Sequence, residues 1–350
     1  MKIILTGSCG FAGSTLAAEL LARSGNLEII GVDNLSRSGS ELNRTALTNL
    51  GVQLRHLDIR SATDVDSLPA ADFVIDAAAN PSVLAGVDGA MNSRQVIEHN
   101  LIGTVNLLEY CKQHKAGFIL LSTSRVYSIA ALTAVPVELL GDAFRPTDFS
   151  ALGLTQLGVG EDFSTTPPLS LYGTAKLASE QLALEYGEAF DFPVWINRCG
   201  VLAGAGQFGR ADQGIFSYWI HSYRARKRLQ YIGFDRQGHQ VRDCLHPRDL
   251  ATLILKQLAG ASGNRVANFG GGRASAMSLR QLSQWCASRF GPHEIESGSQ
   301  QRRFDLPWLV LDCTRAEQQW NWRPKTPRDQ ILEEIAAHAE SHPDWLKISR

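Results

Sequence analysis

Two residues with acid/base potential, Tyr172 and Lys176, lie one helical turn apart in the motif Tyr-Gly-Thr-Ala-Lys. Tyrosine is a poor base at neutral pH because its ordinary pKa is about 10. An ammonium four residues further along a helix lies on the same face, where it stabilises the phenolate and lowers that pKa. The pair therefore predicts the removal of a proton from a substrate hydroxyl group.

Two further features point to the same chemistry. The hydroxyl cluster Ser122-Thr123-Ser124 precedes the tyrosine, and one of its hydroxyls would hold the same substrate oxygen. Near the start of the chain, Gly7, Gly10 and Gly13 have the spacing G-x-x-G-x-x-G. The first permits a sharp turn, the second lets backbone approach a pyrophosphate, and the third lets a helix pack closely on the preceding strand. Together these motifs predict nicotinamide-dependent chemistry on a hydroxyl or carbonyl.

An alternation of strands and helices is expected to position these motifs. Apolar runs predict strands at 2–6, 28–32, 52–57, 73–77, 117–121 and 193–197, and helical spacing predicts helices at 14–23, 95–112 and 176–190. Such a βαβ alternation forms a parallel sheet. We therefore predict an α/β fold, a Rossmann doubly wound parallel sheet with helices on both faces.

The regular alternation stops near residue 200. We predict a NAD-binding Rossmann domain over 1–199 and a smaller C-terminal α/β substrate lobe over 200–350, with about 215–260 returning in part to the first domain. Helices are expected near 216–226, 250–258 and 279–289. Residues 128–168 show little periodicity, and such a long loop is either a lid or partner contact, or a surface decoration.

The residue that follows the second predicted strand selects the cofactor. Asp33 lies twenty residues beyond Gly13, where a carboxylate accepts hydrogen bonds from the adenosine ribose and repels a 2′-phosphate. This favours NAD over NADP. Arg37 argues in the opposite direction, although it cannot remove the charge of Asp33. Asp58 and Ile59 follow the third strand and either bracket the adenine or simply end the strand.

Composition narrows the class of protein. The 350 residues are 44% hydrophobic and 20% charged, with a formal net charge of −1. Nothing resembles the basic stripe that nucleic acid requires, and no apolar run is long enough to suggest a membrane span or a signal peptide. Six cysteines are scattered singly, as in proteins of a reducing compartment, so we expect a cytoplasmic enzyme. His338 and His342 share a helical face without a nearby carboxylate, and no metal site is expected.

The motifs together resemble a known family. Residues 6–13, 33–36, 122–127 and 172–176 are similar to the extended short-chain dehydrogenase/reductase family of nucleotide-sugar epimerases and dehydratases, and the similarity runs nearly end to end. Residues 206–214, 240–250 and 343–346 resemble the branch that epimerises CDP-paratose at C2. Two features depart from the family pattern: Ser128 stands where the family usually has glycine, and the 128–168 segment is unusually long.

The resemblance implies particular roles. The family's catalytic hydroxyl lies four residues before Tyr127, so the catalytic residues would be Thr123, Tyr172 and Lys176. The implied cofactor-binding residues are Gly7, Gly10, Phe11, Ala12, Gly13, Asp33, Asn34, Asp58, Ile59, Ala78, Asn100 and Lys176. The implied substrate-binding residues are Asn80, Ser124, Arg125, Asn197, Gln207, Phe208, Gln213, Tyr231, Arg242 and Arg303.

Some of the substrate residues can also be weighed by their chemistry. Arginine matches phosphate oxygens with paired donors, which favours Arg242 and then Arg303 as ligands of a diphosphate, unless either is an ordinary surface arginine. Phe208 and Tyr231 either flank the nucleotide base or belong to the core. The resemblance also implies a homodimer that pairs the helices expected at 95–112 and 176–190.

The residues after the catalytic hydroxyl distinguish between reactions. Family dehydratases usually place Asp-Glu there, whereas this chain has Ser124-Arg125, which cannot supply the acid/base pair for eliminating water. Glu161 or Asp162 could replace that pair if the long loop folds over the site. We predict NAD-dependent epimerisation of a nucleotide-diphosphate sugar at C2. The alternatives are a 4-epimerase, a 4,6-dehydratase, a net reductase or dehydrogenase, and a non-catalytic dinucleotide sensor.

Overall fold

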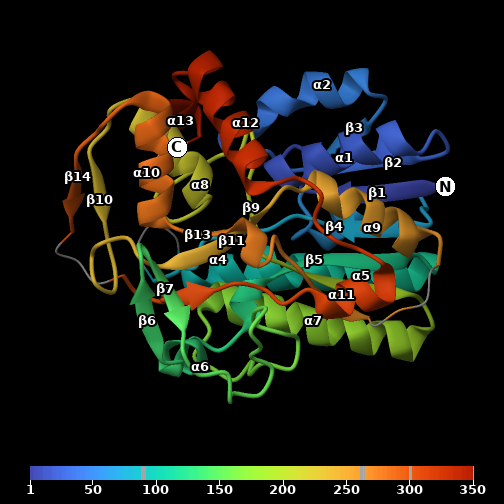
Figure 1. Cartoon of the computed structure of the whole chain (residues 1–350). Helices are drawn as coiled ribbons and strands as arrows, with labels where there is room; N and C mark the ends of the chain where they lie inside the picture. Colours follow the sequence, from blue (N-terminus) through green and yellow to red (C-terminus); the bar gives the residue numbers. More distant parts are fainter. Residues whose placement is uncertain (88–91, 261–262, 264, 299–301, 350) are drawn as a thin grey trace.

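A parallel sheet of seven strands forms the centre of the computed structural model, which describes residues 1–87, 92–260, 263, 265–298 and 302–349 (Figure 1). The strand order is β12-β8-β5-β4-β1-β2-β3, and every neighbouring pair is parallel. The strands are β1 (Lys2–Thr6), β2 (Glu28–Asp33), β3 (Gln53–His56), β4 (Phe73–Asp76), β5 (Gly117–Thr123), β8 (Val194–Cys199) and β12 (Val266–Phe269). The predicted doubly wound α/β fold is confirmed.

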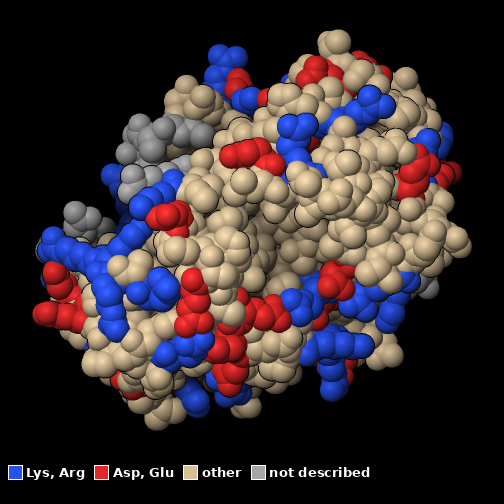
Figure 2. All heavy atoms as spheres, turned by 90° about the horizontal axis from the view of Figure 1, so that it is seen from above, with Lys and Arg blue, Asp and Glu red and all other residues tan. Residues whose placement is uncertain are grey.

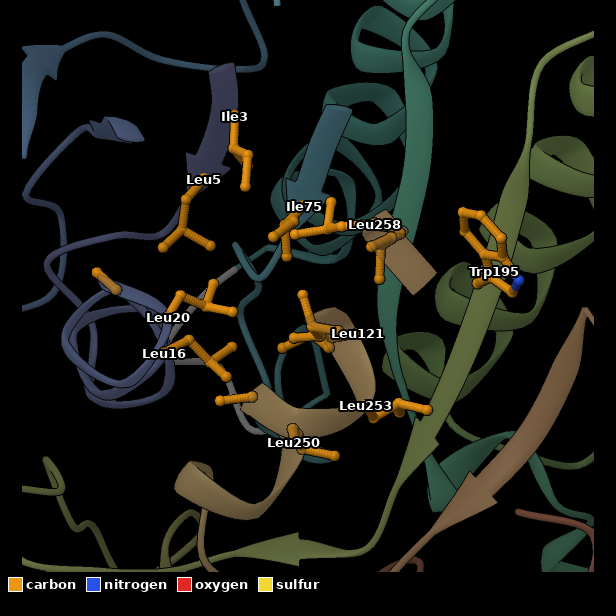
Figure 3. Packing of buried hydrophobic residues seen from close by; sticks show 14 of the residues in the cluster. Ile3, Leu5, Leu16, Leu20, Ile75, Leu121, Trp195, Leu250, Leu253 and Leu258 are labelled. Atoms are coloured by element: carbon orange, nitrogen blue, oxygen red, sulfur yellow. The ribbon is translucent and has the colours of Figure 1, made fainter. Parts of the chain in front are cut away.

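Helices cover both faces of this sheet. One face carries α1 (Phe11–Arg23), α2 (Asn43–Asn49), α9 (Arg248–Leu258) and α11 (Thr314–Trp320), and the other carries α3 (Ala62–Asp66), α5 (Gly103–His114) and α7 (Leu171–Phe190). Leucines recur at helical spacing on α1 and α9, so each helix presents one apolar stripe to the sheet. Leu16 and Leu20 of α1 meet Leu250 and Leu253 of α9 over Ile75 (Figure 3).

The order of the strands explains where a ligand can enter. The chain moves outward from β1 to β3 in one direction and from β4 to β12 in the other, so the winding reverses between β1 and β4. Loops at the carboxyl ends of these strands diverge to opposite faces, which leaves a crevice there. The glycine turn follows β1, and the Ser122–Thr123 hydroxyls end β5 at the same edge.

The second lobe combines short strands with a helical layer. Its core lies between the helices α8 (Ile215–Arg224), α10 (Leu279–Phe290), α12 (Arg328–Ser341) and the short α13 (Trp345–Ile348). Its strands are β9 (Val201–Leu202), β10 (Leu229–Tyr231), β11 (Val241–Leu245), β13 (Ala276–Ser278), β14 (Ile295–Ser297) and β15 (Trp308–Leu309). Strand β11 pairs with β9, β13 and β15, and β10 pairs with β14.

The region expected to return to the Rossmann domain is divided in the structure. Helix α9 packs on α1, and β12 completes the sheet beside β8. Helix α8 instead packs against α10 and α12 in the second lobe. The chain therefore crosses between the two parts more than once, and both parts contribute to the crevice between them.

Two segments differ from their predicted form. The helix expected at 95–112 consists of α4 (Ser93–Ile97), a π-helical turn over Glu98–Ile102 and then α5. Residues 128–168 are more ordered than expected, with α6 (Ile129–Ala134) and an antiparallel hairpin of β6 (Val137–Leu140) and β7 (Ala143–Pro146). This segment packs against residues 306–311 of the second lobe, a tertiary contact that local periodicity does not reveal.

Candidate active site

A cavity of about 740 Å³ lies between the sheet edge and the second lobe. Its walls come from the turns after β1, β2, β4 and β5, the start of α7, the glycine-rich residues 200–216, and residues near β11, β13 and β15. The surface seen from above carries interspersed acidic and basic groups, with neither sign dominating this face (Figure 2). Recognition of a charged ligand must therefore depend on groups inside the cavity.

The glycine turn has the backbone geometry of a phosphate cradle. Gly7 has φ +62°, and a Cβ on it would lie 2.9 Å from the carbonyl oxygen of Ala77. A Cβ on Gly13 would lie 2.1 Å from the Gly7 carbonyl oxygen, so only glycine lets α1 pack this closely. Helix α1 begins at Phe11 with no side-chain cap, and Phe11 and Ala12 line the cavity. The amino end of the helix therefore presents its amides to an anion.

Asp33 lines the cavity at the end of β2. Its carboxylate accepts hydrogen bonds from the backbone amides of Cys9, at 2.9 Å, and Leu35, at 2.8 Å. Burial raises the pKa of Asp33 above its ordinary value, and these backbone donors oppose the shift. Arg37 does not pair with Asp33 in this arrangement, because its guanidinium donates to the side chain of Gln213 and the carbonyl oxygen of Phe208.

The turn after β3 supplies a second polar corner. Asp58 accepts hydrogen bonds from Asn34, at 3.1 Å, and from the guanidinium of Arg60. These contacts, with that of Arg60 the largest, hold the pKa of Asp58 well below its usual range. Asp58, Ile59 and Asn34 all line the cavity, as does Ala78 after β4. The structure thus brings these four predicted cofactor-binding residues together from the ends of β2, β3 and β4.

The candidate base lies deep in the site. Tyr172 is buried in the first turn of α7, where Ser170 caps the helix and Gly173 lets it approach the backbone of Arg125. Burial raises the pKa of Tyr172 to about 12, while hydrogen bonding to Thr123 and the charge of Arg125 oppose that shift. Thr123 accepts a hydrogen bond from the Arg125 amide at 3.2 Å, which leaves its own proton to donate.

Lys176 is buried behind Tyr172 and does not line the cavity. Burial lowers the pKa of Lys176, and the carboxylates of Asp76 and Glu180 oppose that effect. Asp76 in turn accepts hydrogen bonds from Thr6, at 2.7 Å, and Thr104, at 2.9 Å. The charge of Arg125 also lowers the pKa of Tyr172, an influence that the helix-spacing argument did not anticipate.

Three arginines meet at the end of the cavity formed by the second lobe. Arg125, Arg242 and Arg302 line it together with one carboxylate, Asp305, which lies 3.7 Å from Arg242. Burial, followed by the charges of Arg242 and Arg302, lowers the pKa of Arg125 to about 9. Positive charge thus exceeds negative charge in a buried corner, which favours an anionic ligand.

Several predicted substrate residues do line the cavity, and three do not. Asn80, Ser124, Gln207, Phe208 and Gln213 are on its wall with Arg125 and Arg242. Asn197 is in the core instead, where its amide exchanges hydrogen bonds of 3.1 and 2.8 Å with Gln257. Tyr231 stacks on Trp219 in the second lobe, and Arg303 is exposed on the surface.

Among the predicted cofactor residues, Asn100 also lies off the cavity wall. It is buried in the π-helical turn, where its side chain pairs with the backbone of Asn80 in both directions, at 2.9 and 3.2 Å. Asn100 therefore holds the turn after β4, since both its side-chain oxygen and its side-chain nitrogen are hydrogen-bonded to the Asn80 backbone.

The proposed substitutes for a dehydratase acid/base pair also lie elsewhere. Glu161 accepts a hydrogen bond from the Asn268 amide at 2.7 Å, and Asp162 pairs with Arg315 at 3.1 Å. Neither lines the cavity. The 128–168 segment therefore does not carry these carboxylates to the residues near Tyr172.

Sequence reasoning missed other groups on the cavity wall. Arg302 lines the cavity, whereas its neighbour Arg303, the predicted diphosphate ligand, is exposed. Neighbouring side chains of an irregular loop point in different directions, so the sequence alone did not show which arginine faces inward. The Ser82 hydroxyl donates to the Asp212 carboxylate, joining two loops far apart in the chain. Asp212 and Arg210 belong to a family-like segment, which was the only signal available for them.

Two further features of the described residues concern metal ions and membranes. No group of three or more His, Cys, Asp or Glu residues in those parts of the chain is placed to hold a metal ion. His338 and His342 stack on each other with ring centres 4.3 Å apart. Within the same described ranges, no helix combines the length and apolar character needed to cross a bilayer.

Comparison with known proteins agrees with this geometry. Residues 3–270 match the model of the NAD dependent epimerase/dehydratase family. The chain is 29% identical to a CDP-paratose 2-epimerase of Salmonella typhi over 93% of its length and 95% of the relative's. It is 24% identical to a UDP-glucose 4-epimerase of Mycoplasma pneumoniae over 95% and 94%.

A solved structure has the same fold. The UDP-glucuronic acid 4-epimerase of Bacillus cereus, solved in complex with UDP-glucuronic acid and NAD, superposes with a TM-score of 0.77 at 24% identity. The alignment covers 97% of this chain and 99% of that one. This chain belongs to the NAD dependent epimerase/dehydratase family. It is an enzyme of the extended short-chain dehydrogenase/reductase type, and its cofactor is NAD.

Proposed function

We propose that this enzyme epimerises a nucleotide-diphosphate sugar at C2 through a transient keto-sugar. The observation that carries the reaction type is the convergence of Tyr172, Thr123 and Arg125 at the inner end of the cavity. The similarity to a CDP-paratose 2-epimerase over nearly the whole chain supports the choice of C2. The similarity to a UDP-glucose 4-epimerase keeps C4 as the second candidate.

The site offers a place for each part of the ligands. The glycine turn and Asp33 would hold NAD, which when bound supplies a hydride acceptor and donor beside the sugar. The corner formed by Arg242, Arg302 and Arg125 would bind the diphosphate of the sugar nucleotide, because guanidinium groups match phosphate oxygens. The sugar would then lie between that corner and Tyr172.

The residues near the sugar would move one proton in each direction. In its phenolate form, Tyr172 takes the proton of the reacting hydroxyl while Thr123 donates a hydrogen bond to the same oxygen. The keto-sugar then rotates in the site, and its carbonyl carbon is reduced on the opposite face. Tyr172 returns the proton to the same oxygen in this step. The sugar is inverted at one carbon, and neither a proton nor an oxidising equivalent is lost overall.

Elimination of water needs a further acid/base pair that this corner does not provide. Ser124 and Arg125 occupy the positions after Thr123, and Glu161 and Asp162 are engaged outside the cavity. A guanidinium does not exchange its proton at ordinary pH, so Arg125 cannot act as the missing acid or base. We therefore propose that the keto-sugar is re-reduced and not dehydrated.

Isotopic labelling distinguishes these reactions. The enzyme would be incubated with CDP-, UDP-, GDP- and dTDP-sugars, each deuterated at C2 or at C4, and the products identified by NMR and mass spectrometry. We expect inversion at C2, retention of the C2 deuterium, no solvent label and a primary isotope effect from the C2 label alone. An isotope effect from the C4 label alone would establish the 4-epimerase, and loss of one water would establish a dehydratase.

The proposal also covers the cellular compartment and the oligomeric state of the enzyme. We infer a cytoplasmic protein, because its six cysteines are unpaired and five of them are buried, as expected for structural thiols in a reducing compartment. We also infer a homodimer that forms through α5 and α7. These two helices pack side by side, and Leu182 and Phe190 of α7 and Ile102 beside the start of α5 are exposed apolar residues.

A further inference from the structure

The loop at residues 207–214 forms one wall of the cavity, and it is supported both by a backbone bridge between Arg210 and Gln213 and by groups outside the loop. Gln207, Phe208, Arg210 and Gln213 all line the cavity. The segment contains no helix or strand, and Gly206 and Gly214 at its two ends have φ +75° and +69°. A segment without a helix or strand takes part of its position from the groups packed on its outer side.

The outer side of this loop is covered by α13 and the residues around it. The indole of Trp345 stacks on Phe208 with ring centres 5.2 Å apart and planes inclined by 17°, and its N–H donates to the Gln207 carbonyl oxygen at 2.9 Å. Arg210 donates to the Ser349 carbonyl oxygen at 3.3 Å. Trp345 is buried, so these contacts are made away from solvent.

Helix α13 is itself anchored to both parts of the molecule. On the Rossmann side, the Ser38 hydroxyl donates to the Ile348 carbonyl oxygen at 2.6 Å. A Cβ on Gly39 would lie 2.9 Å from both Ile348 and the Phe208 ring, so the turn after β2 touches the loop and the helix together. On the other side, His338 of α12 meets the Trp345 ring edge-on at 4.7 Å.

We propose that Trp345 is a positioning residue that holds residues 207–214 against the cavity, so that α13 sets how tightly the enzyme keeps its ligands. The loop is held between Phe208–Trp345 stacking on one side and Arg37 on the other, and Arg37 lies four residues beyond Asp33. Release of Trp345 would free the loop at Gln207 and Phe208, where it begins. The part of this inference that concerns the sugar nucleotide rests on the proposed function, whereas loop mobility and dinucleotide retention do not.

The test compares Trp345→Ala and Trp345→Phe with the native enzyme. Alanine removes both the ring stack and the N–H donor, whereas phenylalanine keeps a smaller aromatic ring for the stack and loses the donor. The matched control is Lys347→Ala on the same helix, because Lys347 is exposed and its ammonium pairs with the exposed Asp344. Hydrogen exchange of the amides at 207–214, the rate of NAD release from the holoenzyme, and kcat and KM are measured for each.

For Trp345→Ala we expect exchange at 207–214 and NAD release to accelerate about tenfold or more, with exchange in β1 to β5 unchanged. The KM for the sugar nucleotide should rise about tenfold while kcat stays within about twofold, since Trp345 does not touch the reacting atoms. Trp345→Phe should lie between native and alanine, and Lys347→Ala should match the native enzyme.

Native-like exchange and NAD release in Trp345→Ala would overturn the proposal, as would a uniform acceleration of exchange throughout the molecule. If the alanine variant does not fold, Ser38→Ala removes one anchor of α13 and must accelerate exchange at 207–214 to a smaller extent; no acceleration there would also overturn it. Absence of epimerase activity in the native enzyme would instead count against the proposed function and leave the exchange and NAD results valid.

Discussion

Arg198 donates hydrogen bonds of 2.7 and 3.1 Å to the carboxylate of Glu180, and both side chains are buried. Glu180 lies one turn beyond Lys176 on α7 and also accepts a hydrogen bond from Ser122, next to the catalytic hydroxyl candidate. The ion pair therefore joins α7 to β8 and β5 directly behind the proposed base. Its integrity should matter to folding and to the protonation of Lys176.

Glu180→Gln tests the structural part of this arrangement. The amide keeps the shape of the carboxylate but leaves the buried Arg198 without a counter-charge, and breaking a buried pair in this way costs about 3–5 kcal/mol of unfolding free energy. Urea denaturation should show the loss as a lower midpoint. Arg228→Ala breaks an exposed pair with Glu296 and should leave the midpoint unchanged, whereas equal effects of the two variants would contradict the argument.

The pH dependence of turnover should report on Tyr172. Burial raises its pKa to about 12, and the Thr123 hydrogen bond and the Arg125 charge act in the opposite direction. Only the phenolate accepts a proton, so kcat/KM should rise with pH on the alkaline side. Thr123→Ala and Arg125→Met each remove an influence that lowers the pKa, and both should move this rising limb to higher pH, as should Lys176→Ala.

Tyr172→Phe provides the reference for that experiment. Loss of the hydroxyl should lower kcat by about 10²–10⁴-fold, which is the usual contribution of a positioned acid/base group, and the rising limb should disappear. Bound NAD and the thermal midpoint should be retained, because one buried oxygen atom is removed and the ring remains. A near-native kcat in this variant would show that another group is the base.

The sequence predicts the cofactor half of the site better than the substrate half, for a physical reason. Gly7, Gly13 and Asp33 act through backbone geometry and strand ends, which nearby residues determine. Among the predicted substrate residues, Asn197 has the right chemistry for a ligand, but its amide pairs with Gln257. Asn100 is a comparable exception on the cofactor side, because its amide pairs with the Asn80 backbone. Such pairings depend on contacts across the fold that no local pattern encodes.

In the second lobe too, local sequence does not determine which single residue faces the cavity. The sequence predicts Arg303 as a substrate residue, but Arg302 is the one that lines the cavity. The direction of each side chain in an irregular loop is set by its tertiary contacts. Residues 128–168 appeared featureless because the hairpin β6–β7 is short and half exposed. Their packing against residues 306–311 gives them order that periodicity cannot predict.

Asp33→Ala should change the preference of the enzyme between cofactors. Removing the carboxylate takes away a ribose acceptor and the charge that repels a 2′-phosphate, so NAD should bind more weakly and the exclusion of NADP should relax. Affinities for both dinucleotides can be measured by calorimetry on apoenzyme. Arg37 is held by Gln213 and Phe208, so we expect the affinity for NADP to rise by less than the affinity for NAD falls. An unchanged NAD affinity would show that Asp33 does not contact the ribose.

The homodimer can be tested on the helix face that would form it. Leu182 and Phe190 on α7 and Ile102 at the start of α5 are exposed, which is unusual for three large apolar residues on neighbouring helices. Leu182→Glu places a charge at that face and should convert a dimer of 38.3 kDa chains into monomers by light scattering. Leu152→Glu is the matched control, since Leu152 is even more exposed but lies on the 128–168 segment. Dissociation by Leu152→Glu and not by Leu182→Glu would place the interface on that segment instead of on α5 and α7.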